Sequence, residues 1–262
     1  MTQGVPEADL DAGFRARHAV LAAGYGDRPD PDDPSLVLAM PLVLHIPKAD
    51  PPARSALLAA AATATVALCL DERVGAGADG EPGPWSADYR AWTGARIRKV
   101  ARRARGAQWL AAQSVDGVTA EVGGAQARAL VPGPVGALDA RIRKLQIGGT
   151  DLDHDRPGDP DDGTVVLWID GSLGMTVGKA AAQVGHAAMI LAGAMTAEQA
   201  WQWARDDFRC AVRDAEPDRW SALVGELAAG RAVAVRDAGF TEVAPGSTTV
   251  AARLPGSTGS LD

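Results

Sequence analysis

Three polar residues, Lys179, Gln183 and His186, have the spacing that places them on one face of a helix. They lie in the segment GMTVGKAAAQVGHAAM (174–189), which follows an apolar run at 165–169 and is typical of a strand, a glycine-bearing loop and a helix. Alanines flank the three side chains, so a ligand or another backbone can come close. The chain has four lysines against 22 arginines, and an ammonium near a helix start favours an oxyanion or a phosphate.

Other chemistries that use a glycine loop or a histidine are poorly supported. A nucleotide-binding P-loop needs a first glycine and a magnesium-binding hydroxyl at the positions that Leu173 and Ala180 occupy. The sequence has no G-x-S-x-G nucleophile elbow. Its histidines do not form a metal-binding cluster; they are His18, His45, His154 and His186. We therefore expect no metal and no cofactor.

Composition indicates a soluble, cytoplasmic protein. The 262 residues are 47% hydrophobic and carry a net charge of −7, which argues against a generally basic nucleic-acid binder. Cys69 and Cys210 lie far apart, without metal spacing, which favours a reducing compartment. The start of the chain lacks a signal pattern, and the 15-residue uncharged run 56–70 is short for a membrane span, which needs about 20 residues.

Two segments resemble the signatures of the type-2 peptidyl-tRNA hydrolases. GKAAAQVGHAAM resembles that family's G-K-x-A-A-Q-x-x-H-A helix, and RDAGFTEVAPGSTTVAARLPG resembles its D-A-G-x-T-[QE]-[IV]-x-P-G-[ST]-x-T-V motif. The resemblance covers about 164–256. Two departures stand out: the usual M-G-K-G-K is replaced by Met175-Thr176-Val177-Gly178-Lys179, and Asp170 and Ser172 occupy the first loop, where an arginine and an aspartate are usual.

The resemblance implies an enzyme that cleaves the ester joining a peptide to the 3′ ribose of tRNA. It places Asp237 and Thr241 at catalytic positions beside Lys179, Gln183 and His186 on the functional helix. Ser247 and Thr249 fall on its hydroxyl positions beside the Pro-Gly turn.

Ester hydrolysis needs a positioned water and stabilisation of the oxyanion. We expect Asp237 to position the water, Lys179 to stabilise the oxyanion, and Thr241 with Gln183 to hold the ester. His186 either binds substrate or is a core histidine.

The chain also resembles itself. Shifted by 123 residues, the segment starting at Val43 aligns without gaps on the segment starting at Val166, and each reads as a strand, a turn-rich loop and an alanine-rich helix. The pattern predicts two tandem α/β domains of two or three layers, each with a small mixed four-stranded sheet and flanking helices, packed as an internal pseudo-dimer. We expect an N-terminal helix and linker (1–34), a degenerate, inactive copy (35–147), an acidic linker (148–163) and the hydrolase domain (164–256).

The individual elements can be placed from the same patterns. In the first block we expect strands at 36–46, 95–101, 117–122 and 129–135, with helices at 53–69 and 104–113. In the second we expect strands at 164–170, 208–213, 231–236 and 247–253, with helices at 178–194, 197–204 and 217–229.

The first block lacks the reactive residues but holds a basic stretch. With the 123-residue shift, Ala56, Ala60 and Thr63 stand at the positions equivalent to the polar stripe. Val122 stands at that of Asp237 if Gly124 is matched to Gly239. Between Arg90 and Arg105 the block has seven basic residues and no acid. We expect these cations to contact tRNA phosphates, independently of the base sequence of the RNA. The expected contacts are Arg96, Arg98, Lys99, Arg102, Arg103 and Arg105.

Three functions remain open. The leading one is peptidyl-tRNA hydrolysis, with the chain able to act as a monomer because it is its own pseudo-dimer and with no membrane partner. The alternative is a non-catalytic tRNA- or RNA-binding protein that keeps the fold. The third is hydrolysis of a related ester or amide on another carrier. Acyl preference cannot be inferred from these residues.

Overall fold

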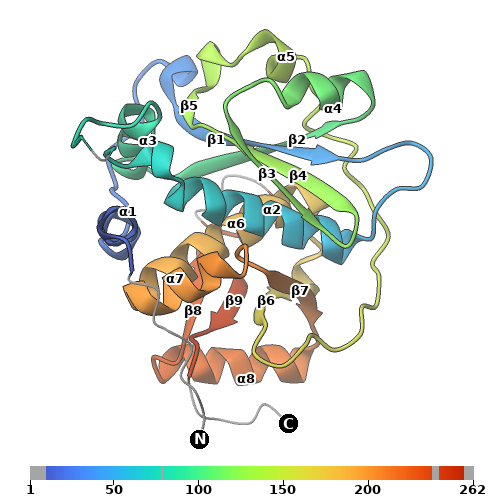
Figure 1. Ribbon diagram of the computed structural model, residues 1–262. Helices are drawn as coiled ribbons and strands as arrows, with labels where there is room; N and C mark the ends of the chain where they lie inside the picture. The colour runs from blue at the N-terminus through green and yellow to red at the C-terminus, as the bar shows by residue number, and fades with distance from the viewer. Residues whose placement is uncertain (1–9, 78, 238–241, 257–262) are drawn as a thin grey trace, which may run out of the picture.

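The computed structural model describes residues 10–77, 79–237 and 242–256. Within them the chain forms two mixed sheets with the same strand order and the same pairing directions (Figure 1). In spatial order, the first sheet contains β2 (Arg98–Ala104), β1 (Leu38–His45), β4 (Ala125–Leu130) and β3 (Gly117–Val122). The second contains β7 (Cys210–Ala215), β6 (Val165–Asp170), β9 (Thr248–Arg253) and β8 (Ala232–Arg236). The expected α/β architecture with two mixed sheets is confirmed, except that the two-residue β5 (Gly133–Pro134) adds a fifth strand to the first sheet.

Helices cover both faces of each sheet. The two long alanine-rich helices, α2 (Arg54–Leu70) and α6 (Val177–Ala194), lie between the sheets, and α8 (Pro217–Ala228) covers the outer face of the second (Figure 1). The outer face of the first sheet carries α4 (Ala107–Ala112) and α5 (Ala140–Arg143). The remaining helices are α1 (Ala12–Ala22), α3 (Ser86–Thr93) and α7 (Ala197–Arg205). In the described part of the chain, no helix combines the length and apolar character needed to cross a bilayer.

The two halves share one core because α2 and α6 pack directly against each other. At their crossing a Cβ added to Gly185 would lie 2.6 Å from Oγ1 of Thr65, a buried side chain whose hydroxyl already donates to the Ala61 carbonyl. Each helix also packs on a strand of the opposite sheet, α6 on β2 and α2 on β7. The main apolar cluster accordingly draws on both halves.

The segments outside the two sheets tie the halves together. In α1, the Arg17 guanidinium donates to the Leu70 carbonyl at the end of α2, and the His18 ring bonds to the Ala192 carbonyl of α6. In the acidic linker, the Asp155 carboxylate accepts hydrogen bonds from the backbone N–H and the hydroxyl of Ser55 at the start of α2. Cutting the chain at this linker would expose the apolar helix crossing, so point substitutions are the better probes of each half.

Two expected strands are displaced along the chain. The strand expected at 95–101 is β2, which begins and ends three residues later. The strand expected at 129–135 is β4, which begins at Ala125 directly after the two-residue Gly123-Gly124 turn. Pro132-Gly133 therefore follows the last long strand of the first sheet, whereas Pro245-Gly246 precedes β9. The Pro-Gly pairs of the two halves therefore stand at different places relative to their sheets.

Candidate functional site

The start of α6 is held by side chains that fix the geometry of its first turn. Thr176 is the N-cap, and its hydroxyl accepts a hydrogen bond from the Lys179 N–H at 3.2 Å. The Gly178 N–H donates to the hydroxyl of Thr150, which is buried, at 3.1 Å. Glu242 accepts from both the N–H and the hydroxyl of Thr176, so a carboxylate also lies at the positive end of the helix dipole.

The lysine of this turn contacts the aspartate that follows β8. The Lys179 ammonium hydrogen bonds to Oδ2 of Asp237, 58 residues along the chain, and the two side chains are only 10% and 7% exposed. The Gln183 amide, one helical turn further along α6, donates to the same carboxylate oxygen at 2.9 Å. Two donors thus converge on one buried carboxylate, a stronger constraint than a surface ion pair provides.

The orientation of Gln183 is set from the second sheet. Thr249 on β9 is fully buried, and its hydroxyl donates to Oε1 of Gln183 at 2.6 Å. Because this contact occupies the amide oxygen, the amide NH₂ must face Asp237. Thr249 therefore fixes the orientation of the Gln183 amide.

The backbone around Asp237 explains why the carboxylate points inward. The pairing of β8 with β9 is irregular between Val235 and Arg236, and such bulges redirect the side chains that follow. The Asp237 N–H then donates to the Ser247 carbonyl at 2.9 Å, and the Asp237 carbonyl accepts from the Gly246 N–H at 2.7 Å. Ser247, predicted as a hydroxyl contact, has a backbone role in this arrangement.

Of the two remaining predicted residues, only His186 is described, and it is not part of this cluster. Thr241 lies outside the described residues. His186 packs edge-on against Tyr25, with ring centroids 5.4 Å apart, and its Nε2 is buried without a hydrogen-bond partner among the described residues. Burial, and then the nearby charge of Lys99, hold the pKa of His186 well below its ordinary value, so the ring is neutral at pH 7.

The basic stretch of the first half does not form one continuous cationic face, because successive side chains of β2 point to opposite sides of the sheet. Arg98 forms two hydrogen bonds of 2.5 Å to Asp30, and Arg102 donates to the backbone carbonyls of Arg143 and Leu145. The Lys99 amine is buried beside the Trp92 ring, 5.1 Å from its centroid, and burial lowers its pKa to about 8.

The remaining cations of this stretch lie nearer the surface. Arg103 is half-buried, whereas Arg96 and Arg105 are exposed.

No metal-binding group of three or more His, Cys, Asp or Glu occurs among the described residues. Both cysteines are buried thiols, and burial raises the pKa of Cys69 to about 12 and that of Cys210 to about 11.

Sequence reasoning missed three residues that shape the site. Thr176, three residues before Lys179, had a recognisable signal, because a threonine there is a typical N-cap. Glu242 lies inside the second motif, but its contact with Thr176 depends on how the chain folds back. Thr150 lies in the segment expected to be a linker, and its burial has no local signal.

The second half thus has an α/β fold with a mixed sheet, and a buried cluster of Lys179, Gln183 and Asp237 lies at the start of α6. Residues 164–262 match the family model of peptidyl-tRNA hydrolase PTH2. The match confirms the family resemblance of this part of the chain, which is less than half of its length. No curated protein and no solved structure matches the chain.

Proposed function

We propose that this protein hydrolyses the ester bond between a peptide, or an N-acylated amino acid, and the 3′ ribose of tRNA, and that it does so in the cytoplasm. The supporting observation is the buried contact of Lys179 and Gln183 with Asp237, in the half that matches the PTH2 model. These residues supply a carboxylate, an ammonium and an amide at one place, which are the groups that ester hydrolysis needs.

The reaction follows from what each group can do. Asp237 orients a water molecule, whose oxygen bonds to the acyl carbon while the bond from that carbon to the ribose oxygen breaks. The water proton passes to the departing ribose oxygen, which gives a free peptide acid and a tRNA with a 3′ hydroxyl. Lys179 stabilises the negative charge that develops on the acyl oxygen. Gln183 and Thr241 hold the ester, and Thr249 keeps Gln183 in orientation.

We infer that the first half is a degenerate copy of the hydrolase domain without chemistry of its own. The shared strand order and the equivalent central helices support a common origin. Ala56 and Ala60 stand where the second half has Lys179 and Gln183, so the copy offers no donor for a carboxylate. In this proposal residues 35–147 are the copy, 148–163 the linker and 164–256 the hydrolase domain, and tRNA contacts come from surface cations of the copy.

The decisive experiment measures release of N-acetyl-amino acid from N-acetyl-aminoacyl-tRNA by the full chain. We expect wild-type turnover, a loss of about 10²–10³-fold in Asp237→Asn, and wild-type rates in Asp218→Asn, an exposed aspartate on α8 that serves as the control. Tight tRNA binding without release would favour the non-catalytic alternative. Faster hydrolysis of a free acyl ester than of the tRNA ester would favour another carrier.

A further inference from the structure

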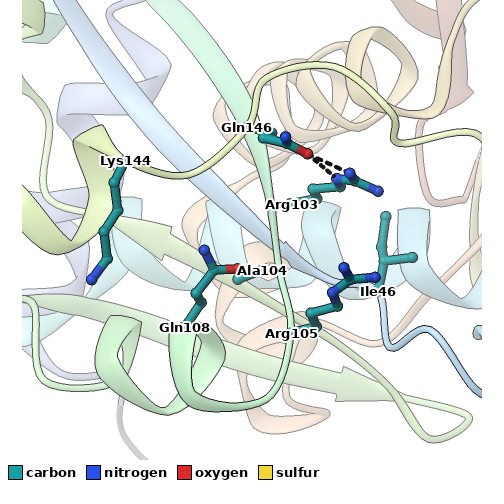
Figure 2. Close-up of a pocket in the computed structure, with 7 residues that line it drawn as sticks. All are labelled: Ile46, Arg103, Ala104, Arg105, Gln108, Lys144 and Gln146. Carbon is teal, nitrogen blue, oxygen red and sulfur yellow. Dashed lines mark hydrogen bonds between the residues drawn. The ribbon is translucent and has the colours of Figure 1, made fainter.

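A cationic cavity lies in the first half, at the end of β2. Its volume is about 220 Å³. It is lined by Ile46, Arg103, Ala104, Arg105, Gln108, Lys144 and Gln146 (Figure 2). These residues come from three separate segments of the chain: the residue after β1, the stretch from the end of β2 into the start of α4, and the stretch that follows α5. The cavity therefore depends on the fold and is not a product of one charged run.

The cations of this cavity have no internal counter-charge. Among the described residues that line it none is acidic, and within the described part of the chain no carboxylate forms an ion pair with Arg103, Arg105 or Lys144. The Asp139 carboxylate is near enough to Lys144 to be affected by its charge, but it accepts hydrogen bonds from the Arg141 guanidinium instead. Three positive groups gathered around one cavity repel one another, and an anion bound between them relieves that cost.

The donors are also arranged in a way that suits phosphate oxygens. The Gln146 amide oxygen accepts two hydrogen bonds from Arg103, one of them from Nε at 2.9 Å, which fixes the plane of the guanidinium (Figure 2). Backbone pairing of Arg103 with Gln146 holds the two residues together. A fixed guanidinium, a second arginine, an ammonium and the Gln108 amide together offer several N–H donors to a tetrahedral anion.

A short segment connects the cavity to the candidate active site. A Cβ added to Gly149 would lie 3.1 Å from the guanidinium carbon of Arg103, and the next residue, Thr150, accepts the Gly178 N–H at the start of α6. Gln146 and Thr150 are four residues apart, so at most about 14 Å separates them. This is roughly the axial rise of four nucleotides in one strand, at about 3.4 Å each.

We propose that this cavity binds a backbone phosphate of the tRNA a few nucleotides from the esterified 3′ end. The first half, which lacks the reactive residues, then anchors the RNA while the second half holds the ester. The proposal rests on the proposed function for the identity of the RNA. It also changes the set of expected tRNA contacts. Arg103 and Arg105 of the basic stretch stay in the set, and Lys144, Gln108 and Gln146 join it. The other cations of the basic stretch leave the set because they do not line the cavity.

The test is binding of deacylated tRNA by the full chain, measured by fluorescence anisotropy between about 50 and 200 mM salt. The variant is Arg105→Gln/Lys144→Gln, which removes two exposed charges of the cavity. The control is Arg143→Gln, an exposed arginine next to Lys144 that does not line it. We expect the double variant to bind about tenfold more weakly at 100 mM salt and its log–log salt slope to fall by about 0.9, the change for one phosphate, while the control stays near wild type.

Deacylated tRNA separates this proposal from the proposed function, because its binding does not depend on hydrolysis. Affinity and slope equal to those of Arg143→Gln would overturn the phosphate site even if the wild type hydrolyses the ester. A cavity-dependent slope without any ester hydrolysis would support the phosphate site and contradict the proposed function. Competition by millimolar inorganic phosphate as strong as that by tRNA would show that the cavity takes a free anion, and would overturn the RNA anchor.

Discussion

The two halves have the same sheet topology but differ at one corner. In each half a long central helix begins beside the end of one strand, α2 beside the end of β3 and α6 beside the end of β8. In the second half that corner brings Lys179 onto Asp237. In the first, a Cβ added to Gly123 would lie 3.6 Å from the Cβ of Ala56, the residue equivalent to Lys179. The first half thus keeps this corner of the fold but lacks the lysine and the aspartate that meet there in the second half.

The connection between strands differs as much as the side chains. The first half joins β3 to β4 by Gly123-Gly124, both with positive φ, 55° and 80°, which is typical of a two-residue hairpin. The second half leaves β8 at Arg236 and enters β9 at Thr248, so the site residue Asp237 belongs to a longer connection. The core helices are thus common to both halves, whereas the longer connection that carries Asp237 is found in the second half.

The largest effect should follow from making the second half resemble the first at its helix start. Lys179→Met removes the ammonium and keeps an unbranched side chain of similar length, so we expect ester release to fall about 10²–10³-fold. Lys48→Met, which changes an exposed lysine of the first half, is the control and should retain activity. Equal activity of the two variants would contradict the difference drawn between the halves. The measurement is release of N-acetyl-amino acid from tRNA.

The helix crossing gives a test of how closely the halves depend on each other. Gly185→Ala places a methyl group against Thr65, and we expect a loss of about 1–3 kcal/mol in the free energy of unfolding. Gly225→Ala, on the exposed face of α8 with nothing within 4 Å of an added Cβ, should instead gain about 0.5–1 kcal/mol from helix propensity. Chemical denaturation measures both. Two separate unfolding transitions in the wild type would show that the halves do not share a cooperative core.

The positioning role of Thr249 predicts a smaller effect on activity. Thr249→Val removes the hydroxyl that orients the Gln183 amide, and we expect kcat to fall about tenfold with little change in KM. Thr249→Ser keeps the hydroxyl and should therefore retain most of the wild-type rate. A merely structural role would instead lower the stability of both variants and leave kcat per folded molecule unchanged.

Lys99 gives the smallest predicted effect, a dependence of stability on pH. Its amine has a folded-state pKa of about 8, below the ordinary value, because burial disfavours the charged form. Below pH 8 the amine is charged in both the folded and unfolded states, and the full cost of burying the charge is present. Between pH 8 and about 10.5 the unfolded chain binds more protons, so this contribution to stability rises with pH.

Lys99→Met should remove that rise. At pH 7 it should increase the free energy of unfolding by about 1 kcal/mol, a modest amount because the stem of Lys99 is only half-buried. The measurement is urea denaturation at pH 7, 9 and 10.5. An unchanged pH dependence in the variant would contradict the burial of this amine.

Most elements of the fold could be predicted because their signals are local. The apolar run before Asp170 and the alanine-rich helix that carries Lys179 have unambiguous periodicity, and the predicted bounds lie within one residue of β6 and α6. The displaced strand β4 shows the limit of this reasoning. The strand expected at 129–135 was placed too late in the chain, because the Gly123-Gly124 turn closes the hairpin and β4 begins at Ala125.

The site could be predicted in part, and the reason is again physical. Helical spacing placed Lys179 and Gln183 on one face, and they do meet one carboxylate. The same spacing also included His186, which lies against Tyr25, a contact made by a segment more than 150 residues earlier in the chain. In the sequence the basic stretch is a continuous run of positive charge, whereas the alternation of side chains along β2 divides its charges between the two faces of the sheet. Long-range packing decided each of these cases.

The central claim is that Lys179 and Asp237 act as one unit, which a double-mutant cycle tests directly. Single-turnover release of N-acetyl-amino acid from tRNA is measured for the wild type, Lys179→Met, Asp237→Asn and the combined variant. We predict that the combined variant is within about threefold of the slower single variant, because either substitution already breaks the unit. Losses that multiply, or full turnover in either single variant, would contradict the account.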